Sequence, residues 1–521
     1  MSNTSEVAKA DGFQRFGSRV FNFRLPTCRP TVDYQASFKS SVGTPEAASF
    51  ITKLTQLRLE MTGSLYSSPG SYDQKIKALD AYLVQVFRLS DAFALQTLKL
   101  DKQLHFEWRG AISDKIEAAK SSDILFEILF LLHTKAILHS TAAKALLDTD
   151  PISFLSDAAK HLVEASSIMS HMATNIGNGT WNRGFCKSSP NPPELSEHMC
   201  AGLAMLFKGE AQALSFMKAA TGGSAPASIK SRLAVGVVKT MMQAFEHLSL
   251  TPESLMRHAD LLSFVHVTRE FYTALAYQHS AQAYVEKTEV GNAIAFCLAA
   301  KTRLTEQRSS SKPVWSVPGL PKFAGAYSEL GNAVAYIVDT VNQIQATAER
   351  DNKFVYFQPV PGPNSSNSNA GLPLPDLPAE ASVMNPGPFV EPDRSSEPRV
   401  TLEYKAKPSV FSSMFSGLMG ATASSPATTT AAAAEGVACA GAADAGATAP
   451  PASAPSQAPS PGTPTDEEYA RTLQRQYDTE AAASTTNTNT NTNTNTTSPS
   501  SSSGAGGAQQ PSGPPAPPAP R

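Results

Sequence analysis

Apolar and polar residues follow one another along most of this chain with the spacing of amphipathic helices. The clearest example lies between residues 201 and 250, where two apolar helical runs flank a turn that contains Gly222, Gly223 and Pro226. In the first run the apolar residues recur three, four and seven positions apart, which places them on one helical face. The second run has an apolar residue at every fourth position: Ile229, Leu233, Val237, Met241 and Phe245.

This predicted hairpin carries apolar residues on more than one face. Each four-residue step turns the second stripe by about 40°, so its ends, Ile229 and Phe245, face about 160° apart. Phe216, nine residues after Phe207, lies on the opposite side of the first helix. Ordinary helix packing accounts for most of these residues. An apolar groove for a partner helix, with a border of basic residues such as Lys218, is the alternative interpretation.

Further helices are expected through most of the first 350 residues. Thr44, Pro45 and Glu46 give a helix-start signal of capping hydroxyl, proline and early carboxylate. Helical patterns follow at 72–98, 108–119, 123–147, 151–173, 193–220, 251–285, 290–308 and 324–350. Residues 1–34 lack helical periodicity, and 21–25 alternate as a short strand would. The pattern therefore predicts an elongated all-α solenoid with a short N-terminal β element.

Composition divides the chain of 521 residues into two parts. From about Gly362 the aromatic residues become rare, and Pro, Ala, Ser, Thr and Gly dominate, including a Thr-Asn repeat at 486–497. Such a segment buries too little apolar surface to offset the entropy lost on ordering. We therefore predict a folded domain at 1–393 and a disordered low-complexity tail at 394–521. The net charge of −2 argues against a nucleic-acid partner.

The sequence carries no recognisable catalytic or metal-binding motif. It has no phosphate-binding glycine loop, nucleophile elbow or zinc-protease motif, and its five cysteines show no ligand spacing. We predict no enzyme activity, no metal and no cofactor. The N-terminus lacks an apolar signal core, the longest apolar run (124–132) is too short to span a bilayer, and the C-terminus lacks a prenylation motif. A cytoplasmic protein is expected.

Four sequence blocks resemble the Bro-one domain family. They are FEWR at 106–109, GEAQA at 209–213, GNAIA at 291–295 and DNKFVYFQPVP at 351–361. The last is the most specific, because it resembles the phenylalanine-aliphatic-tyrosine segment near the end of these domains. The resemblance spans about 21–392 and implies a curved, TPR-like helical domain. It further implies a non-enzymatic adaptor that binds the C-terminal helix of the Snf-seven-type ESCRT-III subunit at endosomal membranes.

The resemblance also assigns a partner-helix site to the hairpin. Lys218, Ile229 and Leu233 match residues of the family's groove. Val383 matches a further aliphatic groove residue, on the arm with which the family's domain closes. The family's large apolar residue aligns with Ser215, and we expect neighbouring Phe216 to fill that volume. The alternative function is a TPR-like scaffold of a signalling assembly without ESCRT contact.

Two short segments of the tail differ from their surroundings. Within 408–420, apolar residues at i, i+3, i+4 and i+7 would give a one-sided helix that meets a membrane or partner. Residues 465–480 resemble an inverted ubiquitin-interacting motif, with ubiquitin contacts expected at Glu467, Tyr469, Ala470, Leu473 and Gln474. A chance apolar cluster and a solvated charged spacer are the respective alternatives.

Overall fold

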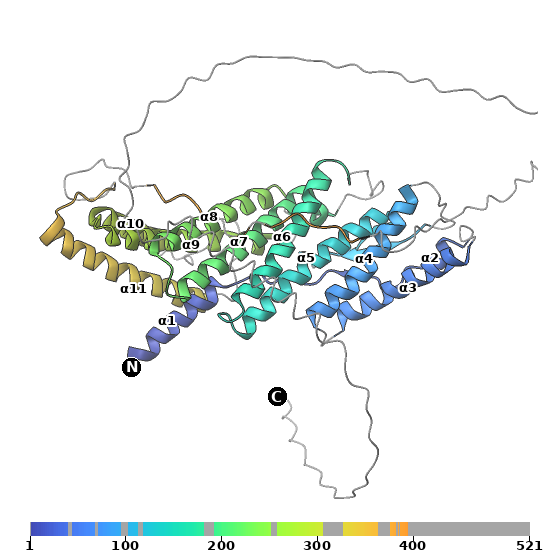
Figure 1. Cartoon of the computed structure of the whole chain (residues 1–521), viewed down its shortest axis with the longest axis horizontal. Helices are drawn as coiled ribbons and strands as arrows, with labels where there is room; N and C mark the ends of the chain where they lie inside the picture. Colours follow the sequence, from blue (N-terminus) through green and yellow to red (C-terminus); the bar gives the residue numbers. More distant parts are fainter. Residues whose placement is uncertain are drawn as a thin grey trace, which may run out of the picture. The chain divides into compact units, whose positions relative to one another are not determined.

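Helices make up nearly all of the regular structure in the computed structural model (Figure 1). It describes residues 2–39, 44–67, 71–94, 103–112, 118–181, 192–251, 258–305, 327–362 and 376–393, except 382, 383 and 385. All of these belong to the first of two compact units, Met1–Gln474 and Arg475–Arg521. The predicted tail, its 408–420 segment and its ubiquitin-binding helix lie outside the described residues and stay predictions.

The described helices follow one another in sequence and in space. They are α1 (Ser2–Gly17), α2 (Tyr34–Ser37), α3 (Pro45–Tyr66), α4 (Tyr72–Ala94), α5 (Ile124–Thr149), α6 (Leu155–Gly177), α7 (Glu197–Thr221), α8 (Ala227–Ser249), α9 (His258–Glu286), α10 (Val290–Thr305) and α11 (Tyr327–Asp351). From α3 to α11 each helix packs against the next, and α1 packs against α11. This neighbour-to-neighbour packing confirms the predicted all-α solenoid.

Several predicted helix starts are confirmed by their caps. The Thr44 hydroxyl accepts a hydrogen bond from Ala47 N at 3.2 Å, and Pro45 is the first residue of α3. The Asp123 carboxylate accepts from Leu125 N at 2.9 Å and begins α5. These side chains satisfy amide groups that the first helical turn leaves without partners, which is why the Thr44 start signal was readable from sequence. Asp123 is the first residue of the range predicted for the second of these helices.

The prediction for the N-terminus was wrong in two respects. Residues 2–17 form helix α1, which a weakly amphipathic sequence did not indicate. Phe13 and Phe16 pack against Phe271 of α9, with ring centroids 6.2 and 4.8 Å away, so contacts distant in sequence stabilise this helix. The expected strand at 21–25 has the predicted alternation of burial but no sheet partner, and β1 (Thr27–Cys28) follows it.

The helix predicted at 108–119 was also wrong, because this region contributes two strands. β2 (Phe106–Arg109) pairs antiparallel with both β1 and β3 (Ala119–Ser121). Phe106 and Trp108 are buried while Arg109 is exposed, which is the two-residue period of a strand. Residues 113–117 lie outside the described part of the chain.

A buried ion pair joins this small sheet to the helices. Arg58 of α3 donates to the Glu127 carboxylate of α5, and both side chains are at most 1% exposed. Tyr82 of α4 donates to Glu127 Oε1 at 3.0 Å, and Trp108 Nε1 of β2 donates to Glu127 Oε2 at 2.6 Å. Arg58 Nη2 also donates to the Arg29 carbonyl beside β1, at 3.1 Å. The Glu127 carboxylate therefore connects α5 with α3, α4 and β2, and Arg58 extends the network to the segment beside β1.

Helix α5 is the most deeply buried element of this region. By length and composition it is the one helix among the described residues that could cross a membrane, but 83% of its apolar window is buried inside the protein. Its Phe130 ring stacks on Trp108 with centroids 5.3 Å apart, and Glu127 forms the ion pair described above. These contacts are those of a core helix.

The ion pair leads to a stability prediction. Arg58→Met should lower the free energy of unfolding by about 3–5 kcal/mol, because it leaves a buried carboxylate without its cation. Arg58→Met combined with Glu127→Gln should recover part of this loss, since the amide is neutral and still accepts from Trp108. Denaturant unfolding followed by circular dichroism measures both effects.

The matched control is Arg109→Met, which removes an exposed arginine from the neighbouring strand. It should change stability by less than about 1 kcal/mol. A double variant that is less stable than Arg58→Met alone would contradict the assignment of the loss to the unpaired charge.

Candidate partner-helix site

The α7–α8 hairpin forms as the sequence predicted. The Ser196 hydroxyl caps α7 by accepting from Met199 N at 3.2 Å. The connecting turn begins where Gly222 N donates to the Lys218 carbonyl at 2.9 Å, and Gly223 has a φ of 73°. That conformation costs a glycine little, which explains why the turn falls at this residue.

The two helices approach each other closely. A Cβ at Gly209 of α7 would lie 2.8 Å from the Met241 Cε atom of α8, and one at Gly202 would lie 2.7 Å from the Leu248 side chain. The absence of side chains at these positions lets the helix axes come together. Most of the apolar side chains of the hairpin are consequently buried between α7, α8 and their neighbours α6 and α9.

An extended segment at 376–393, named here the closing arm, crosses the hairpin. Ala381 N donates to the Arg232 carbonyl of α8 at 3.1 Å, and Gln212 Nε2 of α7 donates to the Ala381 carbonyl at 2.7 Å. Arg232 Nε donates to the Ala379 carbonyl at 3.1 Å. Lys239 and Glu380 form an ion pair at 3.4 Å. Both polar groups of the Ala381 backbone therefore have partners on the hairpin.

The closing arm continues across α6 toward α5. The Phe389 ring lies 5.1 Å from the ring of His171 on α6, and the Lys135 ammonium of α5 lies 5.7 Å from its centroid. Glu391 and His171 approach to 3.3 Å. The arm thus spans four consecutive helices, and in Figure 1 it is the orange segment that runs across them.

Gly236 sets how closely the closing arm approaches α8. A Cβ at this position would lie 2.9 Å from the Ala381 carbonyl oxygen and 3.1 Å from Gln212 Nε2. A side chain here would push the arm away from the helix and disturb the hydrogen bond between Gln212 and Ala381. A glycine in the middle of a helix is a recognisable sequence signal, but the sequence alone did not show what approaches it.

The predicted groove residues of α8 lie on the face that the closing arm crosses. At about 100° per residue, Ile229 faces within about 20° of Gly236 and lies about 10 Å before it along the helix, and Leu233 faces about 60° away. Their side chains are 1% and 0% exposed. The structure therefore encloses both side chains, and Ile229 faces the same side of α8 as Gly236. Val383 lies outside the described residues, between buried Ala381 and Met384 of the arm.

The predicted residues of α7 separate onto different sides of the helix. Phe216 is fully buried and packs against Tyr272 and His279 of α9, with ring centroids 5.4 and 5.5 Å away. It therefore lies in the core beside α9 and does not replace Ser215. The Ser215 hydroxyl donates to the Ala211 carbonyl of its own helix at 3.1 Å. Lys218 is half-buried, and its ammonium donates to Ser156 Oγ of α6 at 2.9 Å.

A buried glutamate on α7 connects the hairpin to the N-terminal segment. Glu210 Oε1 accepts from Phe21 N at 2.7 Å, and its other oxygen has no hydrogen-bond partner among the described residues. Burial raises the pKa of Glu210 to about 8, although the Phe21 hydrogen bond opposes this shift. The carboxyl is therefore mostly protonated at pH 7. With Gln212, the GEAQA block binds chain segments from both ends of the domain.

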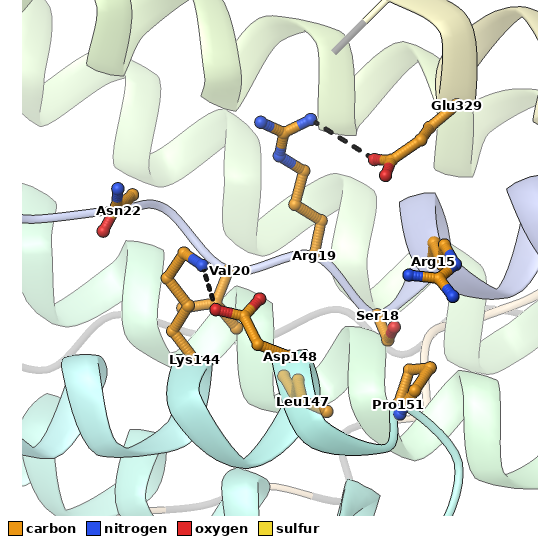
Figure 2. Close-up of a pocket in the computed structure, with 10 residues that line it drawn as sticks. All are labelled: Arg15, Ser18, Arg19, Val20, Asn22, Lys144, Leu147, Asp148, Pro151 and Glu329. Atoms are coloured by element: carbon orange, nitrogen blue, oxygen red, sulfur yellow. Dashed lines mark hydrogen bonds and ion pairs between the residues drawn. The ribbon is translucent and has the colours of Figure 1, made fainter. Parts of the chain in front are cut away.

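A charged cavity of about 360 Å³ lies where α1, α5 and α11 meet (Figure 2). Arg19 and Glu329 face each other across it at 3.9 Å, and Lys144 pairs with Asp148. Burial lowers the pKa of Arg19, and the neighbouring carboxylates of Glu329 and Asp148 oppose this shift. Three cations (Arg15, Arg19 and Lys144) and two carboxylates (Asp148 and Glu329) line the cavity, and Arg15 also pairs with Asp11 outside it. Each cation therefore has a carboxylate partner, so the cavity has no strong preference for a charged ligand.

The described residues show no arrangement typical of a catalytic centre. No group of three or more His, Cys, Asp and Glu residues in this part of the chain could hold a metal ion. His139 and His161 contact each other at 3.0 Å between α5 and α6, and burial lowers the pKa of His139 to about 3. Such an imidazole is neutral at pH 7.

The fold and the hairpin are those of a known class of helical domain. A protein-family model described as the BRO1-like domain, the Bro-one domain of the sequence analysis, matches residues 36–428. The chain belongs to this family. The match extends beyond residue 393, where we predicted the end of the domain.

Among curated proteins, the chain is 22% identical to the BRO1 domain-containing protein BROX of Pongo abelii over 385 residues, which covers 72% of this chain and 88% of that one. It is equally similar to BROX of Mus musculus, with coverages of 72% and 87%.

Solved structures have the same fold. The BRO1 domain of ALIX in complex with CHMP4C is 18% identical, with a TM-score of 0.56 over 72% of this chain and 97% of that one. A structure described as the basis for endosomal targeting by the Bro1 domain is 17% identical, with a TM-score of 0.52 over 69% of this chain and 93% of that one.

The buried Glu210 carboxyl gives a pH prediction. The unfolded chain loses this proton near pH 4.5, whereas the folded chain keeps it up to about pH 8. The contribution of Glu210 to stability is therefore complete below pH 4.5 and is lost as the pH rises to about 8, by up to about 5 kcal/mol. Glu210→Gln should remove this dependence, because the amide does not titrate and still accepts from Phe21.

Urea unfolding of both proteins at about pH 5, 7 and 9 brackets the titration and measures the difference in their free energies of unfolding. The variant should gain stability relative to the unmodified chain between the lowest and highest pH. A constant difference across the series would mean that Glu210 titrates at the same pH in both states.

Proposed function

We propose that this protein is a non-enzymatic ESCRT-associated adaptor. Its α7–α8 hairpin and closing arm would bind the C-terminal amphipathic helix of a Snf-seven-type ESCRT-III subunit. The observation that carries the proposal is that the closing arm is hydrogen-bonded to both helices of the hairpin, through Gln212 of α7 and Arg232 of α8. Lys218, Ile229 and Leu233 belong to the same two helices. Membership of the BRO1-like domain family and the CHMP4C complex of a structural neighbour support it.

The burial of Ile229 and Leu233 adds a condition to this proposal. A partner helix reaches these side chains only if part of their cover moves. The closing arm, which crosses α8 at Arg232 and Gly236, is the element that we propose moves. The hydrogen bonds that join its described residues to the hairpin, and the exposed Lys239–Glu380 ion pair, each contribute about 1 kcal/mol or less to stability. A partner helix that buries several apolar side chains can offset such a cost.

The site is best tested at its rim, where a substitution leaves the core intact. Lys218→Glu should weaken binding of an ESCRT-III C-terminal helix peptide by at least about tenfold, because it replaces a rim cation with a carboxylate. Lys208→Glu, the same change at a half-buried lysine of α7, is the matched control and should bind like the unmodified chain. Isothermal titration calorimetry with the full chain measures both.

A core variant gives an independent check. Leu233→Asp should abolish binding, and because Leu233 is fully buried it should also lower the unfolding temperature. Leu233→Ala keeps the site neutral and should weaken binding with a smaller loss of stability. No binding of the peptide by the unmodified chain would instead favour a TPR-like scaffold without ESCRT contact.

For the cell, the proposal implies a cytoplasmic protein that is recruited to the surface of endosomal membranes. One structural neighbour is described as the basis for endosomal targeting by a Bro1 domain, which is in line with this. We also propose that residues 465–480 bind ubiquitin weakly. The segment has acidic residues first, then the small Ala470 and the apolar Leu473, which suits a helix that lies on an apolar surface.

Nuclear magnetic resonance tests the ubiquitin proposal. Titration of labelled ubiquitin with a peptide of residues 464–480 should give shifts on its apolar patch, with a dissociation constant of about 10–1,000 μM, because a short helix must order on binding. Ala470→Gly with Leu473→Ala should abolish the shifts. If millimolar peptide (about the upper limit of this range) gives none, the segment is a charged spacer.

A further inference from the structure

Four consecutive apolar residues are exposed after α11. Phe354, Val355, Tyr356 and Phe357 are 68%, 63%, 39% and 75% exposed. They lie on and directly after the π-helical turn η2 (Asn352–Tyr356), in which no residue is buried. We name these four residues the apolar tip. Figure 1 shows α11 and the turn that follows it at one end of the row of helices.

The backbone of the apolar tip is held firmly. Asn352 Nδ2 donates to the Gln358 carbonyl at 2.9 Å, and Gln358 N donates back to Asn352 Oδ1 at 2.6 Å. The Gln358 side chain accepts from Gly291 N at 3.0 Å and donates to the Thr288 carbonyl at 2.9 Å. Phe357 adopts a left-handed conformation, with φ at 54°. Such a conformation costs about 1 kcal/mol or more at a bulky residue, so its surroundings must impose it.

These contacts divide the DNKFVYFQPVP block into two sets of residues. Asn352 and Gln358 fix the shape of the turn, and Val360 packs on a small core of α10 and α11 residues. Phe354, Val355 and Phe357 contribute little to the packing of the domain. Consecutive, preorganised and exposed apolar residues of this kind are typical of a docking surface.

Shape and charge indicate the partner. The four side chains are exposed on a turn, so they suit a surface into which they can insert. Lys353 borders them directly, with its ammonium 5.5 Å from the Phe354 ring centroid. Lys287 lies in the neighbouring turn, one residue before Thr288, whose carbonyl accepts from the Gln358 side chain. Aromatic rings flanked by lysine ammonium groups match the boundary between lipid chains and phosphate head groups.

Nearby carboxylates limit the electrostatic part of this attraction. Three of them accept hydrogen bonds from neighbouring side chains: Asp351 from Arg350, Glu289 from Asn292 and Glu349 from Gln345. Glu286 adjoins Lys287 and offsets part of its charge. Insertion of the apolar tip must therefore supply most of the binding, and anionic lipid should strengthen it modestly.

We propose that the apolar tip inserts into the lipid surface of a membrane and that Lys353 and Lys287 meet its phosphate groups. The proposal rests on the proposed function only in that such an adaptor works at a membrane. The partner-helix site takes no part in it.

Vesicle flotation with the full chain tests the tip. Vesicles of phosphatidylcholine, alone or with about one fifth phosphatidylserine, are the probes. Phe354→Ser with Phe357→Ser should reduce binding to both compositions by at least about tenfold. Lys287→Glu with Lys353→Glu should reduce binding mainly to the anionic vesicles, by at least about fivefold. The matched control is Val7→Ser with Leu250→Ser, which removes two apolar residues that are 68% and 64% exposed elsewhere.

Two further measurements make the result specific. In Phe357→Trp the new indole should shift its emission to shorter wavelength on vesicles and be quenched by brominated lipid. The serine variant should keep its melting temperature and its affinity for the ESCRT-III helix peptide, which separates failure of the tip from failure of the partner-helix site. The proposal is overturned if Phe354→Ser with Phe357→Ser binds vesicles as well as the unmodified chain does. It is also overturned if the unmodified chain self-associates through the tip and does not bind vesicles.

Discussion

The N-terminal half of the domain depends on the ion pair and hydrogen bonds that the buried Glu127 carboxylate makes. It lies in the core helix α5 and is fully enclosed, so its charge must be balanced inside the protein. Arg58 supplies the opposite charge, while Tyr82 and Trp108 donate the hydrogen bonds that remain. Because these partners come from α3, α4 and β2, their packing around α5 is specified by directional bonds as well as by apolar contact. The short sheet is thereby fixed against the helices.

Helix α7 has the corresponding role in the C-terminal half. Two of its buried side chains, Glu210 and Gln212, bind backbone groups of Phe21 and Ala381, which are 360 residues apart in the sequence. A third, Lys218, reaches α6. The hairpin that the proposed function uses is therefore also the place where the two ends of the domain are held. Changes in the closing arm and in the N-terminal segment both act on the same helix.

The extent to which sequence predicted the structure follows from the range of the interactions concerned. Capped helices such as α3 and α5 were readable because Thr44 and Asp123 act on amides two or three residues away. Helix α1 was not readable from the sequence, because its stability comes from the contacts of Phe13 and Phe16 with Phe271. At the site, the hairpin and its turn were predictable from spacing and glycines. The enclosure of Ile229 and Leu233, and the direction of Phe216 toward α9, depend on tertiary packing that no local pattern shows.

The packing of α1 against α11 has a consequence for the synthesis of the chain. Helix α1 forms an ion pair between its Lys9 and Asp339 of α11, and its Phe13 ring lies 4.8 Å from that of Tyr336. Those partners are translated more than 300 residues later. The intervening helices can pack on one another as they emerge, because their contacts are with neighbours in sequence. The apolar face of α1 therefore stays exposed to solvent or chaperones until α11 has been synthesised.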